Sequence, residues 1–318
     1  MKPVRLAVVG AGHMGRLHAA KIAALAAETG EAELVAVADL ELARAEEVAA
    51  THGVRAVGAL GALLSEVDAA VVAVPTVAHG EVVAAALDAG LDVLVEKPIA
   101  ATLAEAEALL ARASECGALL QVGHLEWFNA AMRTVASRVS RPRFFEGHRL
   151  GPFPARATDV DVVRDLMIHD IDIVQRLVGE EPERIDAIGV PVLTQQVDIA
   201  NARLSFPNGA VANLTASRVS PTPMRKLRFF QPDGYISIDF LEQSVVLAQR
   251  EARAPQGAEI QIERLPIDRG DALAFQLQAF LRGIRERRVE AGDGDQGLSA
   301  LRTALRVNAA MPPVGVLA

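Results

Sequence analysis

Two different rhythms of hydrophobic residues divide the chain. Up to about residue 123, short continuous apolar runs alternate with alanine-rich stretches of helical length. Runs of Val, Leu and Ala without polar alternation predict strands buried on both faces, and therefore a parallel sheet covered by helices. The predicted strands are 4–9, 34–38, 69–74, 92–95 and 119–122, and the predicted helices between them are 14–28, 42–51, 77–89 and 103–116.

After Asn129 the pattern changes to one helical segment, 160–178, followed by a series of long strand candidates. Turn sequences at 207–209 (Pro-Asn-Gly) and 232–234 (Pro-Asp-Gly) separate some of them, which predicts a mostly antiparallel open sheet and an α+β second domain. We therefore expect an α/β fold with domains 1–123 and 124–318, in which the closing helices could pack back on the first domain. The strands are predicted at 184–193, 199–206, 210–219, 225–231, 235–239, 244–249 and 259–265, and the closing helices at 272–288 and 296–310.

Composition narrows the class of protein. With 318 residues, 51% hydrophobic and 23% charged, the chain is long enough for two domains and too apolar to be disordered. A net charge of -8 disfavours a nucleic-acid partner, and no apolar run approaches the roughly 18 residues of a membrane span. The single cysteine, Cys116, permits no internal disulfide, and we expect the short apolar start of the chain to be a strand and not a signal peptide. We expect a cytoplasmic protein without a membrane partner.

The first motif is Gly10-Ala11-Gly12-His13-Met14-Gly15, which follows the first strand and opens a helix. Glycines at these positions allow a tight turn, close approach to a pyrophosphate and packing of the helix on the strand. The next strand ends at Asp39, where a carboxylate can accept hydrogen bonds from both ribose hydroxyls and repels a 2′-phosphate. Since Leu40 and Glu41 supply no cation, NAD is favoured over NADP. The alternative is a tight turn followed by a solvent-facing aspartate.

The second motif is Glu96-Lys97-Pro98, at the carboxyl end of a predicted parallel strand. Ligands bind at this edge of such sheets, so Lys97 should emerge where a nicotinamide lies. Only four of the 32 basic residues are lysines, which suggests a need for a compact ammonium, although a strand-end lysine can also simply reach to water. Pro75 and Thr76, with His79, follow the neighbouring strand and place a hydroxyl at the same edge, where Thr76 could also cap a helix.

The third group of polar residues lies on the predicted helix 160–178. Asp165, His169 and Asp172 share one face of an otherwise apolar segment, and a histidine oriented by a carboxylate suits the base of an alcohol oxidation. A solvated acidic face, or a buried histidine satisfied by an aspartate, is the alternative. The spacing of the possible metal ligands matches no standard zinc pattern, and we expect no metal site; these ligands are His124, Glu126, His148, His169, Asp170 and Asp172.

Together with Val122-Gly123-His124, these motifs resemble the Gfo/Idh/MocA oxidoreductase family over nearly the whole chain. The resemblance implies an NAD-binding Rossmann domain (1–123) and a substrate-binding domain (124–318) whose open sheet mediates homodimers or homotetramers. It also implies that Lys97 hydrogen-bonds the reacting hydroxyl, that His169 is the general base and that Asp165 binds substrate and supports the proton relay. The implied cofactor-binding residues are Gly10, Gly12, His13, Met14, Gly15, Asp39, Pro75, Thr76, His79, Glu96 and Lys97, and the substrate-binding residues are His124, Asn129, Asp165 and His169.

Within the family, stretches 123–129 and 165–172 are most similar to the branch that acts on nucleotide sugars and includes UDP-N-acetylglucosamine 3-dehydrogenases. This likeness implies hydride transfer between NAD and carbon 3 of a UDP-N-acetyl sugar, as in the synthesis of lipid A or surface polysaccharide precursors. Trp127-Phe128-Asn129-Ala130 departs from the Arg-Phe-Asn-Pro often found there, which leaves the sugar open. A dehydrogenase of free polyols or inositols and a non-catalytic NAD-dependent sensor are the alternatives. Candidate cations for the diphosphate, each also readable as a surface arginine, are Arg149, Arg156, Arg164 and Arg218.

Overall fold

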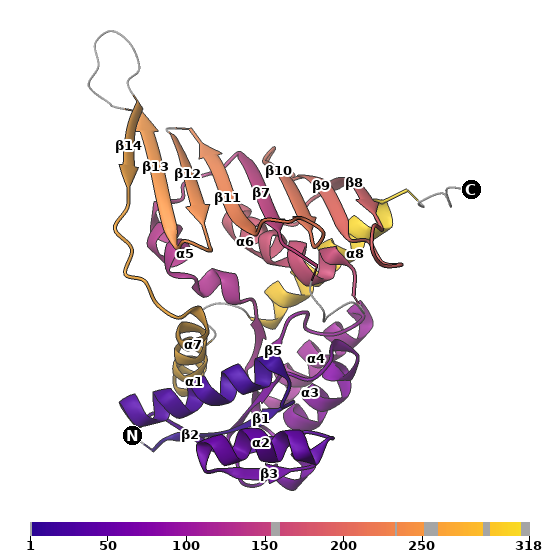
Figure 1. Ribbon diagram of the computed structural model, residues 1–318, viewed down its shortest axis with the longest axis vertical. Coiled ribbons are helices and arrows are strands. Elements are labelled where there is room, and N and C mark those ends of the chain that lie inside the picture. Colours follow the sequence, from indigo (N-terminus) through magenta and orange to yellow (C-terminus); the bar gives the residue numbers. More distant parts are fainter. Residues whose placement is uncertain (1, 154–159, 233, 251–259, 289–292, 313–318) are drawn as a thin grey trace. The chain divides into compact units, whose positions relative to one another are not determined.

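The computed structural model describes residues 2–153, 160–232, 234–250, 260–288 and 293–312, which fall into two compact units (Figure 1). Unit 1 consists of Met1–Leu125 and Asp271–Leu298, and unit 2 of Glu126–Gly270 and Ser299–Ala318. The chain thus first passes from unit 1 to unit 2 after Leu125, two residues beyond the end of the predicted domain 1–123. It later returns to unit 1 with Asp271–Leu298.

Unit 1 is a doubly wound α/β unit around a six-stranded parallel sheet of order β3-β2-β1-β4-β5-β6. The order reverses between β1 and β4, which is where ligands bind in sheets of this kind. The strands are β1 (Val4–Val9), β2 (Ala32–Ala38), β3 (Arg55–Val57), β4 (Ala69–Val72), β5 (Asp92–Glu96) and β6 (Leu120–Gly123). The helices are α1 (His13–Thr29), α2 (Leu42–His52), α3 (His79–Asp88), α4 (Leu103–Cys116) and α7 (Ala272–Glu286).

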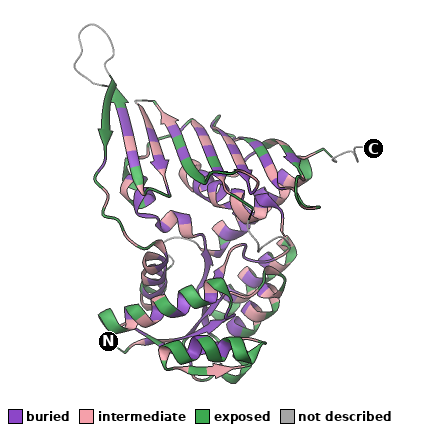
Figure 2. Ribbon diagram, viewed as in Figure 1, coloured by how far each residue is buried: buried purple, intermediate pink, exposed green. Residues whose placement is uncertain are grey.

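Burial explains why these apolar runs form the sheet. All four residues of β4 are buried, and β1 and β5 are almost wholly so, as expected for strands covered on both faces (Figure 2). One core combines these strands with α1, α2 and α7, and Leu277, Phe280 and Leu281 are the contribution of α7. Helix α4 starts with a capping box between Thr102 and Glu105, which fixes its first turn.

Unit 2 contains an eight-stranded sheet of order β14-β13-β12-β11-β7-β10-β9-β8. All neighbouring strands are antiparallel except β7 and β10. One face packs on α5, α6 and the part of α8 from Ser299 onwards (Figure 1). The strands are β7 (Phe144–Leu150), β8 (Arg184–Val190), β9 (Ile199–Ser205), β10 (Val211–Ser217), β11 (Met224–Gln231), β12 (Gly234–Asp239), β13 (Ser244–Arg250) and β14 (Ile260–Arg264), and the helices are α5 (Ala130–Val135), α6 (Ile168–Val178) and α8 (Gly294–Ala310).

The predicted fold class is confirmed: a parallel Rossmann-type sheet accompanies a mostly antiparallel open sheet. Strands β3 and β7 and helix α5 were not predicted from the sequence. Instead of one α-helix over 160–178, a π-helical turn (Val163–Met167) leads into α6. No helix in the described part of the chain has the length and apolar character needed to cross a membrane.

Candidate active site

The glycine motif forms the turn between β1 and α1 in unit 1. Gly10 has a φ of +97°, and a Cβ there would lie 2.5 Å from the carbonyl oxygen of Ala73. A Cβ at Gly15 would collide with the carbonyl oxygen of Gly10. By contrast, no atom lies within 4 Å of the position that a Cβ on Gly12 would take, and Gly12 is the N-cap of α1 without a side-chain cap. Two glycines are therefore required by packing, and the third leaves the N-terminus of α1 open, which fits the pyrophosphate of a dinucleotide.

Asp39 is half-buried at the end of β2 and its carboxylate is tied to the glycine turn. Its Oδ2 accepts a hydrogen bond from the N–H of Ala11 (2.7 Å), and its Oδ1 accepts one from the N–H of Glu41 (2.8 Å). A carboxylate has about four acceptor sites, so both oxygens can still accept bonds from ribose hydroxyls. The residues of this turn thus fit NAD. His13 is exposed and Met14 half-buried at the start of α1.

Past β4 the chain forms a short 3-10 helix, Thr76–Ala78, and then α3, which begins at His79. Pro75 is exposed and Thr76 half-buried, and the N-cap of α3 is Ala78, so the alternative that Thr76 caps this helix is wrong. His79 is only 1% exposed. Its Nδ1 lies 2.8 Å from the carbonyl oxygen of Pro98 and its Nε2 3.0 Å from that of Val74. Burial lowers the pKa of His79, against the effect of these carbonyls.

The segment after β5 carries Lys97, which is half-buried. The preceding Glu96 lies opposite Gly123 of β6, where a Cβ would come 3.1 Å from the Glu96 Cα and Oε2. Glu96 Oε1 lies 2.8 Å from Nε2 of His18, which is fully buried in α1. Burial acts to raise the pKa of Glu96, but the hydrogen bond and charge of His18, with the charge of Lys97, outweigh it and hold the pKa below its usual value. Glu96 therefore stays ionised beside Lys97.

In unit 2, Asp165 lies in the π-helical turn and His169 in the first turn of α6, and both are half-buried. A π-turn inside a helix is uncommon and often marks a functional site. The third member of the predicted polar face differs: Asp172 is 2% exposed and accepts from Nε of Arg176 at 2.8 Å. Asp172 thus belongs to an internal ion pair of α6, and Asp165 and His169 form the accessible part of the predicted face.

A buried ion network lies under the first turn of α6. Arg149 of β7 is 2% exposed, and its guanidinium donates to Oε1 of Glu126 (2.6 Å) and Oδ1 of Asp170 (2.7 Å). The alternative that Arg149 is a surface arginine is therefore wrong. Its guanidinium N–H groups donate to carboxylates of the protein itself. The network links β7, the segment after Leu125 and the turn that carries His169. Half-exposed Arg225 of β11 approaches Glu126 at 3.7 Å and adds a second positive charge.

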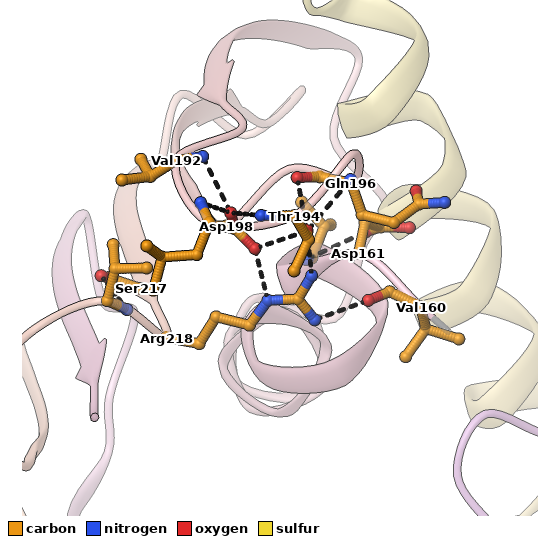
Figure 3. A network of polar contacts seen from close by, with 11 residues as sticks. Val160, Asp161, Val192, Thr194, Gln196, Asp198, Ser217 and Arg218 are labelled. Carbon is orange, nitrogen blue, oxygen red and sulfur yellow. Dashed lines mark hydrogen bonds and ion pairs between the residues drawn. The ribbon is translucent and has the colours of Figure 1, made fainter. Parts of the chain in front are cut away.

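Arg218 is also buried rather than a surface residue, in a second network (Figure 3). Its Nε donates to Oδ1 of Asp198 (2.8 Å) and its Nη1 to the carbonyl of Val160 (2.7 Å). Burial acts to raise the pKa of Asp198, but the backbone N–H groups of Leu193 and Thr194 and the Arg218 guanidinium hold it far below its usual range. The bond to Val160 fixes the chain just before the helical segment that carries Asp165.

Other predicted residues have defined surroundings. Asn129 is 6% exposed; its Oδ1 accepts from the N–H of Ala131 and caps α5, and its Nδ2 donates to the carbonyl of Phe240. His124 is buried directly after β6. Substrate contact by His124 and Asn129 stays a prediction. Arg164 pairs with Asp161 (2.6 Å), and Arg156 lies outside the described residues. Of the six possible metal ligands, the carboxylates of Glu126, Asp170 and Asp172 bind arginines.

Comparison with known proteins covers both units. Residues 4–124 match the oxidoreductase family with an NAD-binding Rossmann fold (GFO_IDH_MocA), and residues 131–237 match the GFO/IDH/MocA C-terminal domain. UDP-N-acetylglucosamine 3-dehydrogenase of Acidithiobacillus ferrooxidans is 39% identical over 310 residues, 97% of each chain. Its crystal structure superposes with a TM-score of 0.91 over 98% of both chains. The scyllo-inositol 2-dehydrogenase (NAD(+)) of Bacillus subtilis is 31% identical over 69% of this chain and 68% of its own length.

Proposed function

The chain belongs to the Gfo/Idh/MocA family of oxidoreductases, and from this premise we propose that it oxidises carbon 3 of a UDP-N-acetyl sugar with NAD. The carrying observation is the level of identity over the full chain. UDP-N-acetylglucosamine 3-dehydrogenase is 39% identical over 97% of both chains, whereas the inositol 2-dehydrogenase of Rhizobium meliloti is 27% identical over 95% of this chain. Since both relatives match nearly the whole chain, it is the higher identity that favours the nucleotide sugar over a free inositol.

The proposed cofactor site uses the β1–α1 turn and the end of β2. The open N-terminus of α1 at Gly12 offers N–H groups to the pyrophosphate, and Asp39, tied to Ala11, accepts from the ribose. When bound, NAD supplies the hydride acceptor for the alcohol carbon. Among the other predicted contacts, Pro75, Thr76 and Lys97 follow the carboxyl ends of β4 and β5, the edge where ligands bind in a doubly wound sheet.

We assign the proton chemistry to Lys97, His169 and Asp165. The ammonium of Lys97 donates a hydrogen bond to the reacting hydroxyl and stabilises the negative charge that develops on its oxygen. The imidazole of His169 accepts the hydroxyl proton, and Asp165 binds substrate and carries the proton onward. Ionised Glu96 next to Lys97 supports this assignment, because its carboxylate accepts a hydrogen bond from the backbone of Lys97 and so holds this segment in place.

The substrate assignment is tested by following NADH absorbance with a panel of alcohols. We expect turnover with UDP-N-acetylglucosamine and little with free N-acetylglucosamine or with myo- and scyllo-inositol, because the free sugars lack the nucleotide. Turnover with an inositol alone would replace the proposed substrate. NAD binding in calorimetry without NADH formation from any alcohol would favour the sensor alternative.

Replacement of Asp39 should change the preference for NAD. In Asp39→Ser the ribose loses a charged acceptor, a bond of about 1.5–3 kcal/mol, so we expect NAD to bind about tenfold or more weakly. NADP should bind better relative to NAD, since the carboxylate no longer repels the 2′-phosphate. Dissociation constants for both nucleotides measure this. Glu41→Ser is the matched control, because it removes an equal charge two residues further on, from a side chain that pairs with Arg44. An unchanged NAD to NADP ratio in Asp39→Ser argues against ribose contact.

We also propose that the protein forms a homodimer or homotetramer. The strand-rich unit 2 exposes several large apolar side chains on β8 and the segment after it, which favours coverage by a second copy. These residues are Ile188, Val190, Val192 and Leu193. Light scattering should give a multiple of the 33.7 kDa chain mass, and a monomer at micromolar concentration would contradict this.

A further inference from the structure

Two buried histidines hold the residues on either side of Lys97. His18 of α1 contacts Glu96, the residue before the lysine, and His79 of α3 contacts Pro98, the residue after it. Strand β5 ends at Glu96, so the sheet ladder does not extend to the backbone of Lys97 and Pro98. The contacts of the two histidines therefore lie where the sheet ladder no longer fixes the backbone.

His18 holds the first of these neighbours through its Nε2. The ring is fully buried in α1, among residues that face the core of unit 1, and Nε2 lies 2.8 Å from Oε1 of Glu96. Its Nδ1 has no hydrogen-bond partner among the described residues, so the contact with Glu96 is the hydrogen bond that this ring makes there. The Glu96 carboxylate also accepts a bond from the backbone of Lys97. A chain of bonds thus runs from α1 through Glu96 to the lysine.

His79 holds the second neighbour through its Nδ1. That atom lies 2.8 Å from the carbonyl oxygen of Pro98, and Nε2 lies 3.0 Å from the carbonyl oxygen of Val74, after β4. At 1% exposure the ring is enclosed by protein, and both ring nitrogens face the backbone. Because burial lowers the pKa of the ring, the imidazole is neutral and carries one N–H. With that hydrogen on Nδ1, His79 donates to Pro98, and its Nε2 only lies beside the carbonyl of Val74.

We propose that His18 and His79 are positioning residues that clamp Glu96 and Pro98 and thereby fix the direction in which Lys97 leaves the sheet. For His79 this role acts through the loop and replaces direct contact with NAD. The proposal rests on the role of Lys97 in the proposed function. A misplacement of about 1 Å at a reacting group can lower a rate by about 100-fold, so a small shift of this segment is enough to matter.

Amide side chains can test each contact separately. The Asn amide nitrogen can stand in for histidine Nδ1, and that of Gln for Nε2. His79→Asn should therefore keep the bond to Pro98, whereas the amide of His79→Gln can donate only to Val74. At position 18 only Gln can reach Glu96. We expect kcat to fall on the order of tenfold or more in His79→Gln and His18→Asn, and to recover to within about threefold of wild type in His79→Asn and His18→Gln. The dissociation constant for NAD should stay within about twofold throughout, since the clamp acts on Lys97.

The control for lost stability is Asp92→Ala. Asp92 is buried at the opposite end of β5, where its carboxylate accepts bonds from the N–H of Leu119 and from Arg287. Its loss should lower Tm but leave kcat near wild type at a temperature where the unit is folded. If Asp92→Ala loses as much kcat as the histidine variants at a similar loss of Tm, the loss of kcat follows from stability alone and the clamp is refuted.

The rescue pattern decides the remaining cases. Equal losses in the Asn and Gln variants at both positions, or NAD affinity that falls in parallel with kcat, would overturn the proposal. Loss of turnover in Lys97→Met together with near-normal kcat in all four histidine variants refutes the clamp and leaves the proposed function intact. Normal turnover in Lys97→Met removes the role assigned to Lys97, on which the clamp rests, whereas absence of turnover in the wild-type enzyme removes the proposed function itself.

Discussion

Lys97→Met should abolish most turnover while NAD binds almost as before. Methionine keeps the length and apolar stem of the side chain but removes the ammonium that we assign to the reacting hydroxyl. Loss of one preorganised donor to a developing oxyanion lowers kcat on the order of 10²- to 10³-fold. Single-turnover NADH formation measures the chemical step, and calorimetry measures NAD affinity separately.

The control for Lys97→Met is Lys21→Met in the same unit. Lys21 lies on α1 and pairs with Asp271 at 2.6 Å, at the surface of unit 1, so its loss should leave kcat within about twofold. A further variant is Lys97→Arg, which keeps the positive charge but replaces the compact ammonium by a planar guanidinium. We expect it to recover little of the rate. Near-normal turnover in Lys97→Met would contradict the assignment.

The parallel half of the fold follows from local sequence. The predicted bounds of β1 (Val4–Val9) and α4 (Leu103–Cys116) agree with the structure. Strands buried on both faces need apolar residues at nearly every position, and glycine turns and capping boxes mark the helix starts, so every signal lies within a few residues. Short β3 was missed because three residues, Arg55–Val57, offer too little pattern at the edge of the sheet.

Strand β7 shows where local pattern fails. It carries Glu146, His148 and Arg149 and so does not have the composition of a central strand, yet it lies in the middle of the second sheet. Arg149 can be buried there only because Glu126 and Asp170, far away in the sequence, neutralise it. Such partners cannot be found from hydrophobic periodicity, and the same holds for Arg218 and Asp198.

Other features of the site had signals that were missed. Asp172 and Arg176 are spaced i, i+4, which favours a pair on a helix and could have separated Asp172 from the predicted polar face. His18 shares a face of α1 with Gly15, Ile22 and Leu25, and a polar residue in such an apolar row indicates an internal partner. The π-helical turn had no such signal, because the residues of Val163–Met167 are equally compatible with an α-helix.

His169→Ala should lower kcat by on the order of 10²-fold or more, since it removes the general base. In the wild-type enzyme kcat should fall on the acidic side of the pH profile, where the imidazole is protonated and cannot accept the hydroxyl proton; the variant should lose this acidic limb. Imidazole added to His169→Ala should restore part of the rate, because a free base can use the space that the side chain leaves. Substitution of Asp172 is an unsuitable control, since it would leave the buried guanidinium of Arg176 without its partner and so destabilise the unit. A variant that keeps both the rate and the acidic limb would show that another group takes the proton, and Asp165, in the preceding π-helical turn, would be the first to test.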